Sequence, residues 1–282
     1  HTFVVGYTRT KEIRADFNDI PHLLIAGQTM QGKSTFLRQL ITTLYINNPT
    51  YLFTLIDLKE GAEFSMFKDL PRVKITADLR EAIQMLEEDK NEMKEKMKTL
   101  AQNECKDIHT YFQKRKEKDK EGNPLVPSLK VSHRIIIIDE ATQMFLANSS
   151  VSMAQAQKSR AASSEIARLG RAAGTHIVIS VQRPDSKALD TQVKANLNGV
   201  VCFRMQDDHS SIGALGTGRA TDLPMIKGRA LWKDVDGLAE IQTPLLTVDA
   251  ANELLKKFRP KKSEVAAEPM VEIPISPRKR DF

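Results

Sequence analysis

Short apolar runs alternate along the chain with longer stretches in which apolar residues recur at helical spacing. The runs at residues 51–56 (YLFTLI), 135–138 (IIII) and 175–181 (THIVISV) have the length of strands and the composition of a buried sheet. Further strands are expected at 22–26, 73–76 and 199–205, and helical patterns at 34–40, 152–173 and 186–196. Buried strands separated by helices are typical of βαβ units, so the pattern predicts an α/β fold with a mostly parallel central sheet flanked by helices.

Four segments fall outside this repeating pattern. Residues 1–19 predict a small N-terminal β-hairpin, and the runs GRALWK (228–233) and LAEIQ (238–242) predict a second hairpin. Residues 79–120 are dense in Lys and Glu with apolar residues at helical spacing, which predicts one long charged helix, either with a solvated face or touching a neighbouring subunit. Residues 259–282 contain four prolines and no periodicity, which is typical of a flexible basic tail or linker.

The segment between the strand at 22–26 and the helix that follows it matches a phosphate-binding loop, G-x-x-x-x-G-K-[ST]. Such a loop surrounds phosphates with backbone amides and the positive end of a helix, and its glycines permit a tight turn and a close approach. Lys33 is then expected to reach the β and γ phosphates and Ser34 to coordinate Mg²⁺. The predicted nucleotide-binding residues are Gly27, Gln28, Thr29, Met30, Gln31, Gly32, Lys33, Ser34 and Thr35. The alternative, an unrelated glycine-bearing loop, is disfavoured by the flanking strand and helix.

Two acidic residues follow the four consecutive isoleucines, at the carboxyl end of a predicted central strand, where open α/β sheets bind ligands. We expect Asp139 to hold Mg²⁺ and Glu140 to polarise the water that attacks the γ phosphate. The alternative for this pair is ordinary helix capping. Gln182, which ends the run at 175–181, is a candidate for sensing the γ phosphate, and the alternative is a capped strand end.

Composition excludes few classes of protein. The 282 residues include 42 basic and 36 acidic side chains, a net charge of +6 that suits a polyanionic partner without requiring one. The two cysteines, Cys105 and Cys202, lie in unrelated contexts without metal-ligand spacing, which argues against a structural metal and for a reducing, cytoplasmic compartment. There is no apolar run of about 18 residues and no signal peptide. The chain begins at His1, as an excised fragment would, so a membrane anchor upstream of it is an open alternative.

The ordered motifs together resemble a known family. PHLLIAG, GKS, IDLKEGAEFSMF, IIIIDEATQMF, RAAGTHIVISVQRPD and KANLNGVVCFRMQD follow one another as in the FtsK/SpoIIIE motor domains of the HerA/FtsK branch of RecA-like P-loop ATPases. The resemblance covers roughly residues 4–247, and its most specific part is the RAAG-H…QRP segment combined with KAN. It implies a RecA-like P-loop NTPase fold and an ATPase motor domain over residues 1–258. It also implies a homohexameric ring that hydrolyses ATP between subunits while driving double-stranded DNA, or in some relatives a protein, through its channel.

Several positions depart from the family pattern. Met30 and Gln31 stand where these motors usually have Gly-Ser, and the arginine expected shortly after the KAN segment is absent. Arg204, which matches an arginine of the secretion and conjugation relatives, is the nominated finger acting on the neighbour's ATP. Its rivals are Arg171 and Arg219.

The resemblance also leads us to look for basic residues facing DNA. Lys227, Arg229 and Lys233, on the second hairpin, are the candidates, and the alternative is that each is a solvated surface charge. Backbone contacts of this kind are salt-dependent and indifferent to sequence.

Three functions are therefore open. The first is an ATP-driven double-stranded DNA translocase in conjugative or mobile-element transfer or in chromosome segregation, attached or not to a membrane-anchored upstream region or a transfer apparatus. The second is the ATPase motor of a protein-secretion system. The third is a nucleotide-dependent scaffold that does not turn over.

Overall fold

A single sheet forms the centre of the computed structural model, which describes residues 1–59, 63–117, 132–184, 189 and 191–260. Its strand order is β2-β1-β10-β9-β8-β3-β7-β6-β4-β5. The six strands from β8 to β5 run parallel: β3 (Leu23–Ala26), β4 (Leu52–Asp57), β5 (Val73–Thr76), β6 (Arg134–Asp139), β7 (Thr175–Val181) and β8 (Gly199–Phe203). The other four pair antiparallel: β1 (Thr2–Tyr7), β2 (Glu12–Asp16), β9 (Arg229–Asp234) and β10 (Gly237–Gln242). The predicted mostly parallel α/β sheet and both hairpins are confirmed.

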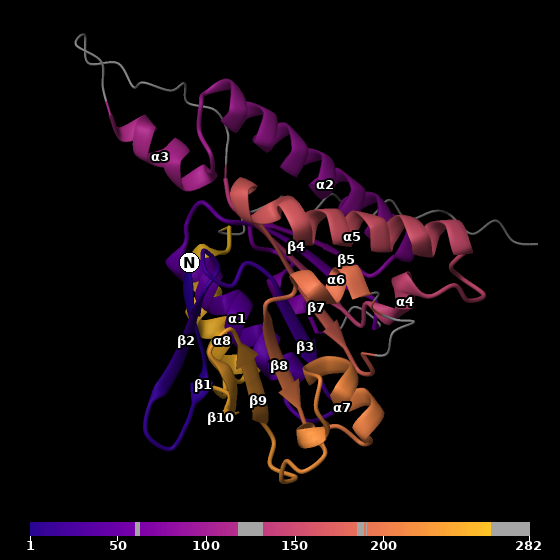
Figure 1. The fold of residues 1–282 in the computed structure, drawn as a ribbon. Helices are drawn as coiled ribbons and strands as arrows, with labels where there is room; N and C mark the ends of the chain where they lie inside the picture. The colour runs from indigo at the N-terminus through magenta and orange to yellow at the C-terminus, as the bar shows by residue number, and fades with distance from the viewer. Residues whose placement is uncertain (60–62, 118–131, 185–188, 190, 261–282) are drawn as a thin grey trace, which may run out of the picture.

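Helices cover both faces of the sheet (Figure 1). They are α1 (Lys33–Asn47), α2 (Leu79–Gln102), α3 (Ile108–Lys116), α4 (Thr142–Phe145), α5 (Met153–Ala173), α6 (Thr191–Asn196), α7 (Asp208–Leu215) and α8 (Val248–Leu255). Short 3₁₀ turns are η1 (Ser65–Phe67), η2 (Gly218–Ala220) and η3 (Lys256–Phe258). None of the helices in the described ranges is long and apolar enough to cross a membrane.

The four isoleucines of β6 show how the core divides into two halves. Ile136 and Ile138 join the cluster that holds the inner faces of α2 and α5, whereas Ile135 and Ile137 join the cluster of α1 and α8. Successive side chains of a strand point to opposite faces, so a strand covered on both sides needs an uninterrupted apolar run. Figure 1 shows α2 and α5 side by side on one face and α1 with α8 on the other.

The prediction of one helix over 79–120 is wrong, because the chain forms two helices there. After α2 ends at Gln102, Glu104 adopts a left-handed conformation with φ 53°, and the Cys105 amide turns back to donate to the Leu100 carbonyl at 2.9 Å. Asp107 then caps α3 by accepting from the Thr110 amide at 2.7 Å. The turn lets Cys105 and Tyr111 pack against Leu100. Burying these side chains stabilises the chain more than continuing the helix through the turn would. Residues 118–120 lie outside the described residues.

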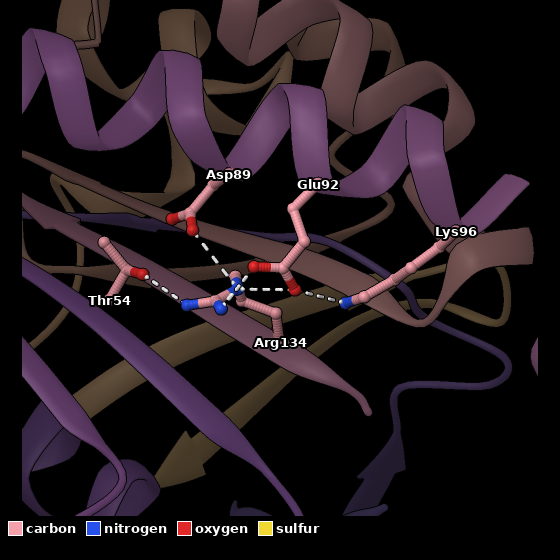
Figure 2. Close-up of polar contacts among 5 residues, drawn as sticks. All are labelled: Thr54, Asp89, Glu92, Lys96 and Arg134. Atoms are coloured by element: carbon pink, nitrogen blue, oxygen red, sulfur yellow. Dashed lines mark hydrogen bonds and ion pairs between the residues drawn. The ribbon is translucent and has the colours of Figure 1, made fainter. Parts of the chain in front are cut away.

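The charged helix α2 is fixed to the sheet by a buried ionic network around Arg134 (Figure 2). Arg134 begins β6 and is 5% exposed. Its Nε lies 3.1 Å from Asp89 Oδ1 and its Nη2 lies 2.5 Å from Glu92 Oε2, both on α2, while its Nη1 donates to Thr54 Oγ1 on β4 at 3.1 Å. Lys96 Nζ, one turn further along α2, lies 3.0 Å from Glu92 Oε1. The charges of this helix therefore face inward as well as outward.

Other segment boundaries differ modestly from expectation. Within the predicted helix at 186–196 the structure describes α6 over Thr191–Asn196, while residues 185–188 and 190 lie outside the described residues. The strand expected at 199–205 ends at Phe203. Of the predicted tail at 259–282, residues 261–282 lie outside the described residues. Helix α8 was not predicted.

Candidate nucleotide site

The phosphate-binding loop joins β3 to α1 and has the backbone that its glycines require. Gly27 and Gly32 have φ values of 147° and 123°, which side-chain-bearing residues rarely adopt. A Cβ on Gly27 would lie 2.6 Å from the Phe203 Cβ, so the loop passes too close to β8 for any other residue. Gly32 is the N-cap of α1 and supplies no side-chain acceptor, which leaves first-turn amides of the helix for an anion.

Lys33 is a buried amine without a protein partner. It is 8% exposed, and its Nζ makes no hydrogen bond within the described part of the chain. Burial lowers the pKa of Lys33, and the nearby charges of Glu140 and Asp139 oppose that shift. A buried cation in this state fits an anionic ligand, because the anion would accept a hydrogen bond from the amine and would place a negative charge beside it.

The acidic pair lies at the end of β6, beside the loop. Asp139 and Glu140 are 5% and 8% exposed. Ser180 Oγ donates to Asp139 Oδ1 at 2.6 Å, and Thr142 Oγ1 donates to Glu140 Oε1 at 2.5 Å. Glu140 has φ 54°, a left-handed conformation that is costly outside glycine.

A pocket of about 640 Å³ contains most of the predicted nucleotide-site residues. Its lining from the predicted set comprises Gln28, Thr29, Met30, Gly32, Lys33, Ser34, Thr35, Asp139, Glu140 and Gln182. Gly27 shapes the loop behind it, and the Gln31 carbonyl accepts from the Gly228 amide at 2.8 Å. Sequence reasoning missed Arg38, Lys59, Glu63, Gly228, Gln242, Thr243, Pro244 and Leu245. These come from four separate segments; Lys59 and Glu63 lie in the IDLKEGAEFSMF motif, to which no site role was assigned, and no motif marks the other six.

Oxygen donors for a hard cation are present in the same pocket. The Ser34 hydroxyl and the Asp139 carboxylate are the type of ligand that Mg²⁺ prefers, and Mg²⁺ is commonly bound by one or two protein ligands with phosphates and waters. Across the described ranges, no group of three or more His, Cys, Asp or Glu residues could hold a metal on its own. The donor set therefore fits a magnesium ion that arrives with a nucleotide.

The three candidate arginines lie outside this pocket. The Arg204 guanidinium donates to the Leu223 carbonyl of the same chain. Arg171 lies exposed in the last turn of α5, and Arg219 lies exposed in η2. Arg204 contacts the loop through its backbone, because its carbonyl accepts from the Gln28 amide at 3.3 Å, but none of the three arginines lines the pocket.

The three basic residues predicted to face DNA are not gathered into one free patch. Lys227 is exposed and lines the nucleotide pocket. Arg229 Nη1 lies 2.7 Å from Glu240 Oε1, and Lys233 Nζ donates to the Leu215 carbonyl at the end of α7 at 2.8 Å. Two of the three therefore have partners within the protein, and their DNA-facing role stays a prediction.

The sheet and the pocket define a P-loop NTPase. The glycine-lysine loop follows β3, the acidic pair follows β6, and β7 with Gln182 at its end lies between them. The family model described as FtsK/SpoIIIE matches residues 3–186, and the chain belongs to the FtsK/SpoIIIE family.

Curated relatives carry the same family name. The DNA translocase FtsK of Helicobacter pylori (strain J99) is 27% identical over 252 residues, which cover 88% of this chain and 28% of that protein. The DNA translocase FtsK of Campylobacter jejuni (strain 81-176) is 29% identical over 194 residues, which cover 67% of this chain and 19% of that protein. The chain thus spans less than a third of the length of these relatives.

Solved structures show the same fold. The pCW3 conjugation coupling protein TcpA, in its monomer form with ATPγS, superimposes with a TM-score of 0.79 at 28% identity, covering 91% of this chain and 70% of TcpA. The cytoplasmic domain of the type VII secretion ATPase EccC from Thermomonospora curvata superimposes with a TM-score of 0.74 at 21% identity. The superposition covers 93% of this chain and 31% of the EccC chain.

Proposed function

We propose that this chain is the ATP-hydrolysing motor domain of a ring that moves double-stranded DNA. The observation that carries the proposal is that Lys33, a buried amine with no hydrogen-bond partner among the described residues, lines one pocket with a buried acidic pair in an FtsK/SpoIIIE family member. TcpA, at 28% identity, was solved with ATPγS, which supports ATP as the nucleotide here.

Each step of hydrolysis has a candidate residue in this pocket. Lys33 and the amides of the loop would hold the β and γ phosphates, and Ser34 with Asp139 would hold Mg²⁺. Magnesium, when bound, supplies charge that offsets the charge of the phosphates. Glu140 would orient and deprotonate the attacking water, and Gln182 would contact the γ phosphate.

An arginine from a neighbouring subunit would complete the site. Arg38 is the one arginine among the described pocket-lining residues, and it already donates to the Leu246 carbonyl at 3.0 Å and lies 3.7 Å from Glu63. We therefore keep Arg204, with Arg171 and Arg219 as rivals, as the finger supplied in trans within a homohexamer. A finger from the neighbour makes hydrolysis depend on assembly.

The names of the similar proteins support DNA as the substrate, and we propose that this DNA is double-stranded. The curated relatives are named DNA translocases, and TcpA is named a conjugation coupling protein. A basic excess of six charges suits backbone contacts that do not depend on sequence. The proposed setting is the cytoplasm, in conjugative transfer or chromosome segregation, with any membrane tether in a region outside this sequence. The alternative is the motor of a protein-secretion system, because EccC has the same fold.

Steady-state ATP hydrolysis with and without double-stranded DNA tests the proposal. We expect DNA to stimulate the wild type at low salt and the stimulation to fall steeply as salt rises. Lys33→Ala and Glu140→Gln should each lose at least about 100-fold in rate, while Glu140→Gln still binds nucleotide. A rate that DNA leaves unchanged but a polypeptide substrate raises would move the assignment to secretion. An absence of phosphate release would leave only the scaffold.

A further inference from the structure

Each carboxylate of the acidic pair receives one hydrogen bond from a hydroxyl group on a different element. Ser180 Oγ, on β7, donates to Asp139 Oδ1 at 2.6 Å, and Thr142 Oγ1, in the first turn of α4, donates to Glu140 Oε1 at 2.5 Å. Neither hydroxyl residue lines the nucleotide pocket. Both therefore contact the site only through the acidic residues.

Ser180 is a buried polar residue near the carboxyl end of β7. It is fully buried and follows Ile177, Val178 and Ile179, so an alanine would satisfy the packing without a hydroxyl. A buried hydroxyl is unfavourable unless it is bonded, and its partner here is Asp139. The Ser180 carbonyl also accepts from the Ala141 amide at 3.0 Å. One oxygen of Asp139 is thus fixed from the neighbouring strand, and the second oxygen is left for a ligand in the pocket.

Thr142 holds a residue whose backbone is strained. Glu140 has φ 54°, and a left-handed conformation is unfavourable for a non-glycine residue and persists only where surrounding contacts enforce it. The contacts at Glu140 are the Thr142 hydroxyl on its carboxylate and the Gln143 amide, which donates to its carbonyl at 3.0 Å.

The orientation that Thr142 holds is the one that faces the phosphate site. Glu140 and Lys33 line the same nucleotide pocket. Glu140 therefore faces that pocket while its carboxylate is bonded to Thr142. The bond holds Glu140 toward the pocket and not away from it.

We propose that Ser180 and Thr142 are the positioning residues of this ATPase: Ser180 orients Asp139 for the metal, and Thr142 orients Glu140 for the attacking water. The inference rests on the proposed function and extends it, because it assigns each hydroxyl to a different step. Loss of the Ser180 hydroxyl should weaken magnesium use. Loss of the Thr142 hydroxyl should slow the chemical step without changing nucleotide or magnesium affinity.

Two pairs of variants separate these effects from simple damage to the fold. Thr142→Val removes the hydroxyl at nearly constant shape, and Thr142→Ser keeps it. Ser180→Ala removes the other hydroxyl, and its matched control is Ser163→Ala on α5, which removes an equally buried hydroxyl that has no partner among the described residues. Should Ser180→Ala fail to fold, Ser180→Cys, a weaker donor of similar size, takes its place and should give an intermediate effect.

The measurements are kcat, the KM for ATP, the magnesium concentration for half-maximal rate, and the affinity for ATPγS with and without magnesium by calorimetry. Removing a group that orients a metal ligand typically costs 10- to 100-fold in affinity or activity. We expect Ser180→Ala to raise the half-maximal magnesium concentration about 10-fold and to reduce the gain in ATPγS affinity that magnesium gives. Thr142→Val should lower kcat about 10-fold with unchanged KM, and Thr142→Ser and Ser163→Ala should match the wild type.

Failure of this inference and failure of the proposed function give different results. If the wild type hydrolyses ATP and Thr142→Val and Ser180→Ala both match it, the positioning roles are refuted and the ATPase assignment stands. If Thr142→Val raises kcat, the bond from Thr142 restrains Glu140 from reacting, and the proposed positioning role of Thr142 is refuted. If the wild type does not hydrolyse ATP, the proposed function fails. The magnesium dependence of ATPγS binding by Ser180→Ala still decides whether Ser180 orients Asp139.

Discussion

The ionic network that fixes α2 to the sheet should respond very unequally to the loss of its two central members, Arg134 and Asp89. Arg134→Met removes a cation that contacts Asp89, Glu92 and Thr54 (Figure 2). Methionine fills similar space, but it leaves the buried Asp89 without its cation and leaves Glu92 with Lys96 alone. Breaking a buried ion pair in this way costs about 3–5 kcal/mol of unfolding free energy.

Asp89→Asn should cost far less, because the charge of Asp89 is itself unfavourable in this place. Burial raises the pKa of Asp89 from 3.8 to about 6, even though Arg134 opposes the shift. A raised pKa means that ionised Asp89 destabilises the folded state above pH 6, by about 3 kcal/mol at ~1.4 kcal/mol per pH unit. The pKa of about 6 already includes the attraction of Arg134, so asparagine removes a net penalty and leaves Arg134 with Glu92 and Thr54. We expect Asp89→Asn to be at least as stable as the wild type at pH 8, by up to about 3 kcal/mol.

Urea unfolding followed by circular dichroism at pH 8 and pH 5 tests this reasoning. As the pH falls from 8 to 5, the folded wild type takes up a proton on Asp89 before the unfolded chain does. The wild type should therefore gain about 1.4 kcal/mol relative to Asp89→Asn, whatever the other groups do. The reasoning is refuted if Asp89→Asn is as unstable as Arg134→Met at pH 8, or if the difference between the wild type and Asp89→Asn does not depend on pH.

Three further outcomes are expected. Burial lowers the pKa of His22 and His133 from 6.5 to about 3. These two histidines should therefore each lower the unfolding free energy by about 1.4 kcal/mol per unit as the pH drops from 6.5 toward 5, and because the opposite contribution of Asp89 is smaller, urea titrations should show a net fall. Gly27→Ala should weaken ATPγS binding at least about 10-fold by calorimetry. Gly237→Ala, with φ 122° but no atom near its added Cβ, should not weaken it. Mixing Arg204→Ala with Lys33→Ala subunits should restore part of the ATPase rate, because the mixture contains interfaces with an intact loop and an intact finger; no recovery would exclude Arg204 as the finger.

The parts of the fold that could be predicted from sequence are those set by local pattern. The run at 175–181 matches β7 residue for residue, because seven buried positions in succession leave only a covered strand. The break between α2 and α3 was not predictable in the same way. It depends on Leu100, Cys105 and Tyr111 packing together, and the surrounding Lys and Glu residues are good helix formers that conceal the turn.

The candidate site likewise has one part that could be predicted from the sequence and one part that could not. The loop and the acidic pair could be predicted because each is a short motif at a strand end. The opposite wall of the pocket could not, because Thr243 and Leu245 reach it only after α8 packs on α1 and Arg38 bonds to the Leu246 carbonyl, 208 residues away in the chain. The sequence likewise does not show which group a charged side chain will contact. Lys233 is one more basic residue there, and in the structure its amine is bonded to the end of α7.

The phosphate-binding loop is tied at both of its ends to the segment from β8 to β9. The Gln28 amide donates to the Arg204 carbonyl at 3.3 Å, and the Gln31 carbonyl accepts from the Gly228 amide at 2.8 Å. Between these two anchors lie α7, η2 and the exposed residues Met225, Ile226 and Lys227. A loop that shifts on binding phosphates must therefore move these anchors with it or break the bonds to them. Two backbone hydrogen bonds thus join the nucleotide site to an exposed segment, so a shift of the loop on phosphate binding can reach residues 225–227.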